Sequence, residues 1–172
     1  MKRKLSILIL LLLLAGMLTG CGLMVPRPEV KKAEFDFSVT YELNEETKIL
    51  SGVFVCEYNG TSWSLDGGNS RAWKGYFEGR EGEIGYEIPI GTTDDGGTIL
   101  VAFDFYPAYF MGDPSATYLD PPQIYLTITY PMEGVDGLTI ISDEEAIAET
   151  YGVKIISYEY DAPIENTFGL FK

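Results

Sequence analysis

An uninterrupted alternation of apolar and polar side chains over residues 34–43, EFDFSVTYEL, constrains the fold more than any other feature of the chain. Residues two apart lie on the same face of a β-strand, so this segment would present one apolar and one polar face. An amphipathic helix would instead need apolar residues three and four positions apart. The segment therefore predicts a half-buried strand.

Further segments have strand character and are separated by turn sequences rich in Gly, Asp and Pro, such as NEETK, GTTDDGGT and PMEGVDG. These strand segments span residues 49–58, 84–90, 99–106, 124–130 and 153–160. The first of them is apolar on both faces, as in a central strand, and 84–90, 99–106 and 124–130 alternate. Six or seven strands with such turns predict an all-β fold, a single antiparallel β-sandwich of immunoglobulin-like architecture. A closed barrel is the alternative.

One short helix is predicted near residues 143–151. Ser142 and Glu145 form an S-x-x-E capping box, acidic residues crowd the first turn, and Gly152 can end the helix. Its length fits a connection between strands better than a layer of the fold.

The N-terminus has the composition of an export signal. Lys2, Arg3 and Lys4 are followed by the apolar run Leu5–Leu18. As a helix this run would span about 21 Å, whereas the hydrocarbon layer of a membrane is about 30 Å thick. A signal-peptide core therefore fits better than a transmembrane helix.

Directly after this run, Leu18, Thr19, Gly20 and Cys21 resemble the lipobox of bacterial lipoproteins. The resemblance covers only the N-terminal 21 residues. It implies cleavage before Cys21 and attachment of diacylglycerol to its thiol, which would anchor the chain in the membrane. Two long acyl chains give firm anchoring, where one would be marginal. The resemblance thus implies an exported protein, held on the cell membrane and facing outside the cytoplasm.

These features predict four parts: a signal peptide (1–20), a lipidated tether (21–32), the β-sandwich domain (33–162) and a C-terminal tail (163–172). The chain carries 26 acidic and 12 basic residues. All but one of the acidic residues follow residue 32, whereas the tether contains Arg27, Lys31 and Lys32. Anionic headgroups would attract these cations. So acidic a domain is a poor partner for nucleic acid, whose phosphates require Lys and Arg.

The chain contains no histidine. Ser-His-Asp and Cys-His catalysis and histidine-ligated zinc are therefore excluded. Nucleotide-binding motifs are also absent. Cys56 lies in an apolar strand without an evident base, which predicts an inert, buried thiol. A pair of carboxylates could still hydrolyse glycosides. Among so many acidic residues, however, some pair will always have a suitable separation, so this signal has little value. Asp104 falls opposite the main apolar face, so we expect it in solvent.

Two further features are open to a functional interpretation. The loops TDDGGT and LDGGNS bring together oxygen ligands suited to calcium, but neither matches a calcium-loop motif, and Asp and Gly are ordinary turn residues. We therefore predict no metal and no cofactor. The stretch WSLDGGNSRAWKGYF carries Trp63, Trp73 and Tyr76. These aromatic rings could stack on sugars, or they could plug the open end of the sandwich.

Together, these observations predict a membrane-anchored lipoprotein that acts outside the cytoplasm as a non-catalytic binding or envelope component. A carbohydrate- or peptidoglycan-binding module that uses the Trp63–Tyr76 loop is the alternative. A carboxylate-dependent glycosidase is less favoured. Besides the membrane, an envelope protein or a glycan is a candidate partner, and the sequence does not determine the oligomeric state.

Overall fold

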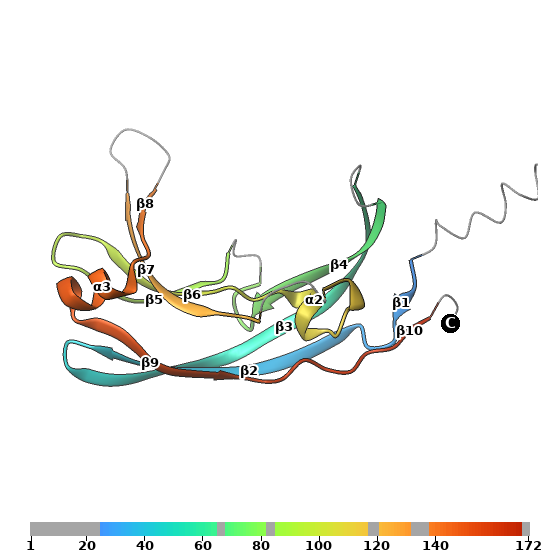
Figure 1. The fold of residues 1–172 in the computed structure, drawn as a ribbon, viewed down its shortest axis with the longest axis horizontal. Coiled ribbons are helices and arrows are strands. Elements are labelled where there is room, and N and C mark those ends of the chain that lie inside the picture. Colours follow the sequence, from blue (N-terminus) through green and yellow to red (C-terminus); the bar gives the residue numbers. More distant parts are fainter. Residues whose placement is uncertain (1–24, 65–67, 82–84, 117–120, 132–137, 170–172) are drawn as a thin grey trace, which may run out of the picture.

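The computed structural model describes residues 25–64, 68–81, 85–116, 121–131 and 138–169. The described chain is mostly β-structure, with two four-stranded antiparallel sheets and a two-stranded one. The two larger sheets lie as layers one above the other (Figure 1). The all-β, antiparallel part of the prediction is confirmed.

The first sheet has the strand order β4-β3-β2-β9 and the second the order β5-β6-β7-β8. The strands of the first are β4 (Gly68–Phe77), β3 (Glu46–Ser64), β2 (Lys32–Leu43) and β9 (Val153–Tyr160). Those of the second are β5 (Glu87–Thr92), β6 (Thr98–Phe103), β7 (Ile124–Pro131) and β8 (Leu138–Ile141). The third sheet pairs β1 (Arg27–Pro28) with β10 (Phe168–Gly169).

The period-two alternation that predicted the first strand corresponds to the two faces of β2. Its apolar face is buried in the core through Phe35, Phe37, Val39, Tyr41 and Leu43. The intervening polar residues are exposed or half-buried. The hydrophobic effect thus fixes the register, because a shift of one residue would move the whole apolar row into solvent.

Aromatic side chains from both sheets form one core. Phe37 of β2 lies with its ring centroid 4.9 Å from that of Phe103 of β6, and Phe77 of β4 contacts the same ring at 4.9 Å. Phe54 of β3 meets Phe105 at 5.1 Å. Most of these pairs are edge-to-face, the arrangement that the ring quadrupole favours.

The prediction that Trp63, Trp73 and Tyr76 share a loop is wrong: Trp63 lies in β3, and Trp73 and Tyr76 lie in β4, which pairs antiparallel with β3. Strand β3 continues to Ser64, and β4 begins at Gly68. The sequence NGT at residues 59–61 resembles a turn, but it lies within β3, where the pairing with β4 shifts register between Tyr58 and Thr61. The turn-like composition therefore belongs to a β-bulge, where Gly60 has a positive φ of 86°.

Helix α3 (Glu144–Tyr151) confirms the predicted helix, with Gly152 in the left-handed conformation at its end (φ +63°). The capping residue differs from the prediction. Asp143, not Ser142, is the N-cap, and its Oδ1 accepts a 3.1 Å hydrogen bond from the Ala146 N–H. The described residues also contain a second helix, α2 (Pro107–Phe110), and the 3₁₀ turn η1 (Pro114–Ala116).

Other boundaries shift more modestly. β6 ends at Phe103 rather than at residue 106, shortly before Pro107 begins α2. The strand predicted at 84–90 is β5, which starts at Glu87; residue 84 lies outside the described residues. Within the described ranges, the longest apolar helical stretch is too short to cross a membrane.

Candidate functional site

The predicted tether and the predicted C-terminal tail meet at one end of the molecule. β1, in the tether, pairs antiparallel with β10, in the tail, so that Arg27 lies opposite Gly169 and Pro28 opposite Phe168 (Figure 1). We call this two-stranded region, residues 26–31 with 166–169, the seam. Residues 26–31 and 166–169 are therefore part of the folded body.

Side chains reinforce the seam beyond its two paired residues. The amide of Asn166 spans Val30, accepting from its N–H at 3.0 Å and donating to its carbonyl at 2.9 Å. Thr167 accepts from the Glu29 N–H through its carbonyl at 2.8 Å and donates its hydroxyl to the Glu29 carboxylate at 2.6 Å. By bonding both backbone groups of Val30, this side-chain amide takes the place of a backbone hydrogen-bonded pair between the two strands.

A buried ion pair fastens the seam to the main body. Arg71 of β4 forms a two-pronged contact with Asp113, from Nε to Oδ2 at 2.7 Å and from Nη2 to Oδ1 at 2.6 Å. The side chain of Arg71 is 9% exposed and that of Asp113 is fully buried. Arg71 also donates to the Pro26 carbonyl at 3.3 Å and lies 4.5 Å from the centre of the Phe168 ring. The Arg71 guanidinium thus contacts both segments of the seam. We call the Arg71–Asp113 ion pair, with its contacts to Pro26 and Phe168, the clamp.

Local sequence explains how these groups converge. Arg71 and Trp73 are two residues apart on β4 and face the same side, so Trp73 Nε1 also donates to Asp113 Oδ2, at 2.8 Å. Asp113 begins the turn Asp-Pro-Ser, in which its Oδ1 accepts from the Ser115 N–H at 2.9 Å and from its hydroxyl at 2.6 Å. Such binding of the backbone two residues ahead is a common role of aspartate in turns.

The electrostatics keep Asp113 ionised. Burial by itself would raise its pKa, but hydrogen bonds from Arg71, Ser115 and Trp73 hold the pKa of this carboxyl well below its usual range. Five donors occupy a group that offers about four lone-pair sites. The carboxylate is therefore saturated and has no capacity left to move a proton, so its role is to hold the clamp together.

The three aromatic residues singled out in the sequence do not form one face. Trp63 is 66% exposed near the end of the β3–β4 hairpin. Trp73 is half-buried, with its N–H bound to Asp113 and its ring 5.4 Å from that of Tyr58. Tyr76, an odd number of residues further along β4, lies on the opposite face, with the Lys74 ammonium 5.1 Å from its ring centre.

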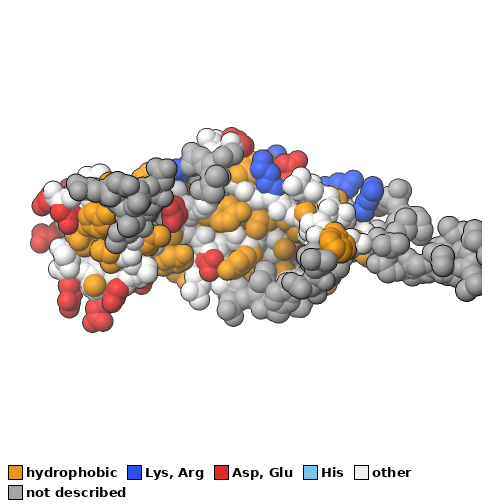
Figure 2. Space-filling view, turned by 90° about the horizontal axis from the view of Figure 1, so that it is seen from above, with side chains coloured by type: hydrophobic (Ala, Val, Ile, Leu, Met, Phe, Trp, Pro, Cys, Tyr) orange, Lys and Arg blue, Asp and Glu red, His pale blue; other side chains and the backbone are white. Residues whose placement is uncertain are grey.

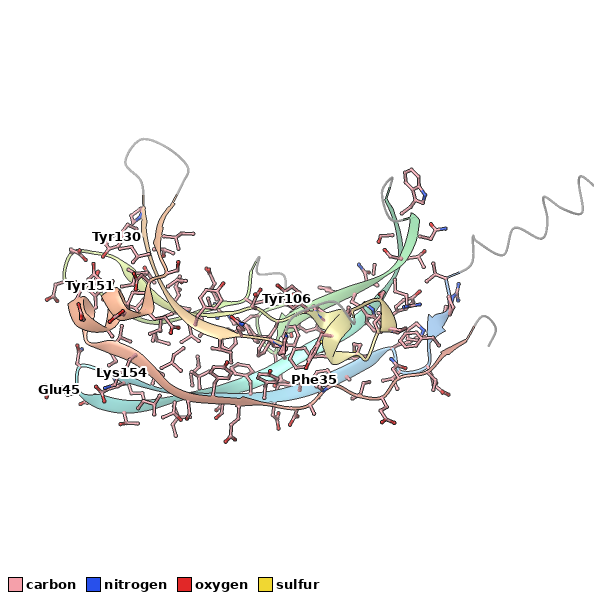
Figure 3. The ribbon with its side chains drawn as sticks, in the orientation of Figure 1. Phe35, Glu45, Tyr106, Tyr130, Tyr151 and Lys154 are labelled. Atoms are coloured by element: carbon pink, nitrogen blue, oxygen red, sulfur yellow. The ribbon has the colours of Figure 1, made fainter. Side chains whose placement is uncertain are left out.

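The acidic loop TDDGGT lies at the other end of the molecule, near Tyr130 and Tyr151 (Figure 3). Thr93 donates to Asp95, and Tyr130 donates to both oxygens of Asp95 at 3.0 and 3.2 Å. These bonds, that from Thr93 first, lower the pKa of Asp95. The hydrogen bond with Tyr151 chiefly raises the pKa of Tyr130 to about 12. No cluster of three metal-ligating side chains occurs in the described ranges, and part of LDGGNS lies outside them.

Of the two cysteines, Cys21 lies outside the described residues. Cys56 is fully buried in β3 and is not in a disulfide, and burial raises the pKa of its thiol. The predicted burial of this side chain is confirmed, as is the exposure of Asp104.

The sequence reasoning missed the clamp. The alternation of Arg71, Trp73, Gly75 and Phe77 was a strand signal, and the turn GDPS placed an aspartate where it caps a 3₁₀ turn. Neither pattern indicates that the two segments touch. Comparisons of the chain with protein-family models, with curated proteins and with solved structures found no match.

Proposed function

We propose that this protein is an exported lipoprotein, anchored through diacylglycerol on Cys21, that acts as a non-catalytic binding or envelope component on the outer side of the membrane. The observation that carries the proposal is that very few residues separate the lipobox-like segment, which ends at Cys21, from the folded domain. Only residues 22–24 separate Cys21 from the described chain, and Glu29 and Val30 are hydrogen-bonded to residues 166–167 of the C-terminal segment. A lipid on Cys21 would therefore hold a folded domain at the membrane.

The finer fold class is part of the same proposal. We place the domain among the β-sandwiches of immunoglobulin-like architecture. The two facing sheets with their shared aromatic core support a sandwich. So does the spatial order β9-β2-β3-β4, in which a late strand returns beside the first of three consecutive ones, as in a Greek key.

The chemistry of the described side chains supports a role without catalysis. The chain has no histidine, and its most perturbed carboxyl, Asp113, is saturated by hydrogen bonds. The Cys56 thiol is buried away from substrates. These groups stabilise the fold, and general acid–base catalysis would need a group that can reach a substrate.

Glycan binding remains the second candidate, with Trp63 as its supporting observation because this side chain is large, apolar and 66% exposed. Binding would then depend on Trp63 and not on Trp73, whose N–H is bound to Asp113. Titration of the Trp63→Ala and unaltered proteins with cell-wall glycans tests this candidate through fluorescence. A glycosidase would also have to turn over such glycans.

Metabolic labelling with a radioactive fatty acid tests the main proposal. Cys21→Ser should take up no label and should accumulate as uncut precursor. Cys56→Ser is the matched control, because it removes the other cysteine, and it should be labelled normally. Label retained by Cys21→Ser would refute anchoring at this residue.

A further inference from the structure

Charged side chains are unevenly distributed over the molecule. Figure 2 shows acidic groups gathered at one end and basic groups toward the other end, where Figure 1 places β1 and β10. The acidic end contains the β2–β3 turn, the TDDGGT loop and the first turn of α3. Its carboxylates include Glu45, Glu46, Asp94, Asp95, Glu144 and Glu145.

The cations of the seam are not neutralised within the described chain. Arg27 and Lys31 are exposed, and neither forms an ion pair with a described residue. At the acidic end, by contrast, the cations form ion pairs. The Lys48 Nζ lies 3.5 Å from a Glu46 carboxylate oxygen, and the Lys154 Nζ lies 3.1 Å from one of Glu42. Arg71 contributes no net charge to the seam because Asp113 balances it.

A cavity of about 390 Å³ opens at the seam. Its lining residues are Arg27, Pro28, Glu29, Lys31, Thr167, Phe168 and Gly169. The Glu29 carboxylate is already hydrogen-bonded to the Thr167 hydroxyl. Two cations and one carboxylate leave a net charge of one positive unit, which complements a phosphodiester. The guanidinium of Arg27 suits such a group because its planar fork can bind two phosphate oxygens at once.

The position of the seam along the chain limits where it can lie. This step rests on the proposed anchoring. From Cys21 to Val25 the chain has four residues, which reach at most about 14 Å. The seam begins at the next residue and is bonded into the body. The cavity would therefore stay close to the phospholipid headgroups.

We propose that the seam docks on the membrane by binding the phosphate of anionic phospholipid headgroups through Arg27 and Lys31. The domain then stands on the membrane in one orientation. Its acidic end points outward, because β2 runs from Lys32 at the seam to Leu43 beside the turn. Twelve strand residues at about 3.3 Å each place Glu45 roughly 40 Å farther out.

Energy transfer in vesicles tests this orientation with the acylated full-length mature protein. A donor dye on Glu45→Cys would report on an acceptor dye on lipid headgroups, since the buried Cys56 does not compete for the label. Vesicles of phosphatidylcholine alone would be compared with equal parts of phosphatidylcholine and phosphatidylglycerol. We expect lower energy transfer on the anionic vesicles, because docking lifts the acidic end away from the surface.

The charge variants decide the outcome. Arg27→Gln with Lys31→Gln should lower the ratio of docked to undocked protein about 30-fold, which corresponds to about 1 kcal/mol for each cation near an anionic surface. Lys48→Gln with Lys154→Gln changes the net charge equally at the other end and should leave docking intact. If both double variants respond to anionic lipid as the unaltered protein does, the proposal is wrong.

Two further arms identify the source of the phosphate. Without vesicles, inorganic phosphate should not raise the melting temperature above that in chloride at equal ionic strength. A phosphate-specific rise that saturates at sub-millimolar concentration would show a site for a soluble ligand and would overturn lipid docking. Acyl labelling of each sample separates the two proposals. Labelled protein that fails to orient contradicts only the docking, whereas unlabelled protein contradicts the anchoring.

Discussion

Replacing Asp113 with asparagine should destabilise the protein strongly, because it leaves the Arg71 guanidinium buried without a counter-charge. The amide keeps one acceptor oxygen but places an NH₂ group against at least one of the present donors. Removing one partner of a buried ion pair costs about 3–5 kcal/mol. We expect the lower part of this range, about 3 kcal/mol, because Arg71 remains 9% exposed and still donates to Pro26.

Thermal and urea unfolding measure this loss directly. For a domain of this size, about 2–4 °C of melting temperature corresponds to each kcal/mol, so we expect a fall of about 6–12 °C. Asp104→Asn is the matched control, since Asp104 is exposed. It should change the free energy of unfolding by no more than about 0.5 kcal/mol. If Asp113→Asn lowers the free energy of unfolding by less than about 1 kcal/mol, the argument that this variant leaves Arg71 as an uncompensated buried charge is refuted.

The pH dependence gives an independent test. The pKa of Asp113 is depressed in the folded state, so the unfolded state binds more protons below the ordinary aspartate pKa of about 3.9. The stabilisation is therefore complete above that pH and is lost as the pH falls toward the folded-state pKa. Below about pH 4 the unaltered protein should lose up to about 1.4 kcal/mol per pH unit more than Asp113→Asn. Equal slopes would show that the fold does not lower the pKa of Asp113.

Three other changes probe the described fold. Glu45→Gly should stabilise the β2–β3 turn by about 1 kcal/mol in thermal unfolding, because Asn44 and Glu45 both have positive φ (56° and 63°) and glycine takes that conformation freely; a lower melting temperature would contradict this. Gly112→Ala should cost more than about 2 kcal/mol in urea unfolding, because the added Cβ would overlap the Ile164 carbonyl oxygen, and Gly112 has a φ of +59°; a neutral result would mean that this backbone can shift. Cys56 should resist maleimide in the folded protein and react fully in denaturant, as mass spectrometry can measure, and rapid labelling of native protein would show that β3 opens.

Local pattern was sufficient for several strands, and β2, β7 and β9 were predicted almost to the residue. In β2, alternation in the sequence reports directly which side meets the core. The helix α3 was also predictable, although its cap was assigned one residue early. Ser142 and Asp143 are both good caps, and sequence alone does not separate adjacent candidates.

β4 was missed because its residues carry signals for two structures. Its start is rich in Gly and Asn, which favour turns, and its aromatic residues suggested a binding loop. The strand exists because β3 extends past a bulge and offers a partner for Gly68–Phe77. Pairing partners are a tertiary property, and β-propensity is strongly dependent on that context.

By itself, the sequence determined the β-class, the positions of most strands, the burial of Cys56 and the resemblance of residues 18–21 to a lipobox. Each of these follows from residues close together in the chain. Only the tertiary structure decided that tether and tail form one seam, fastened where Arg71 meets Asp113, 42 residues away. Its contacts with Pro26 and Phe168 join opposite ends of the described chain. The periodicity of a single sequence does not predict such pairs of residues, because long-range contacts arise only when the packing of the core brings distant segments together.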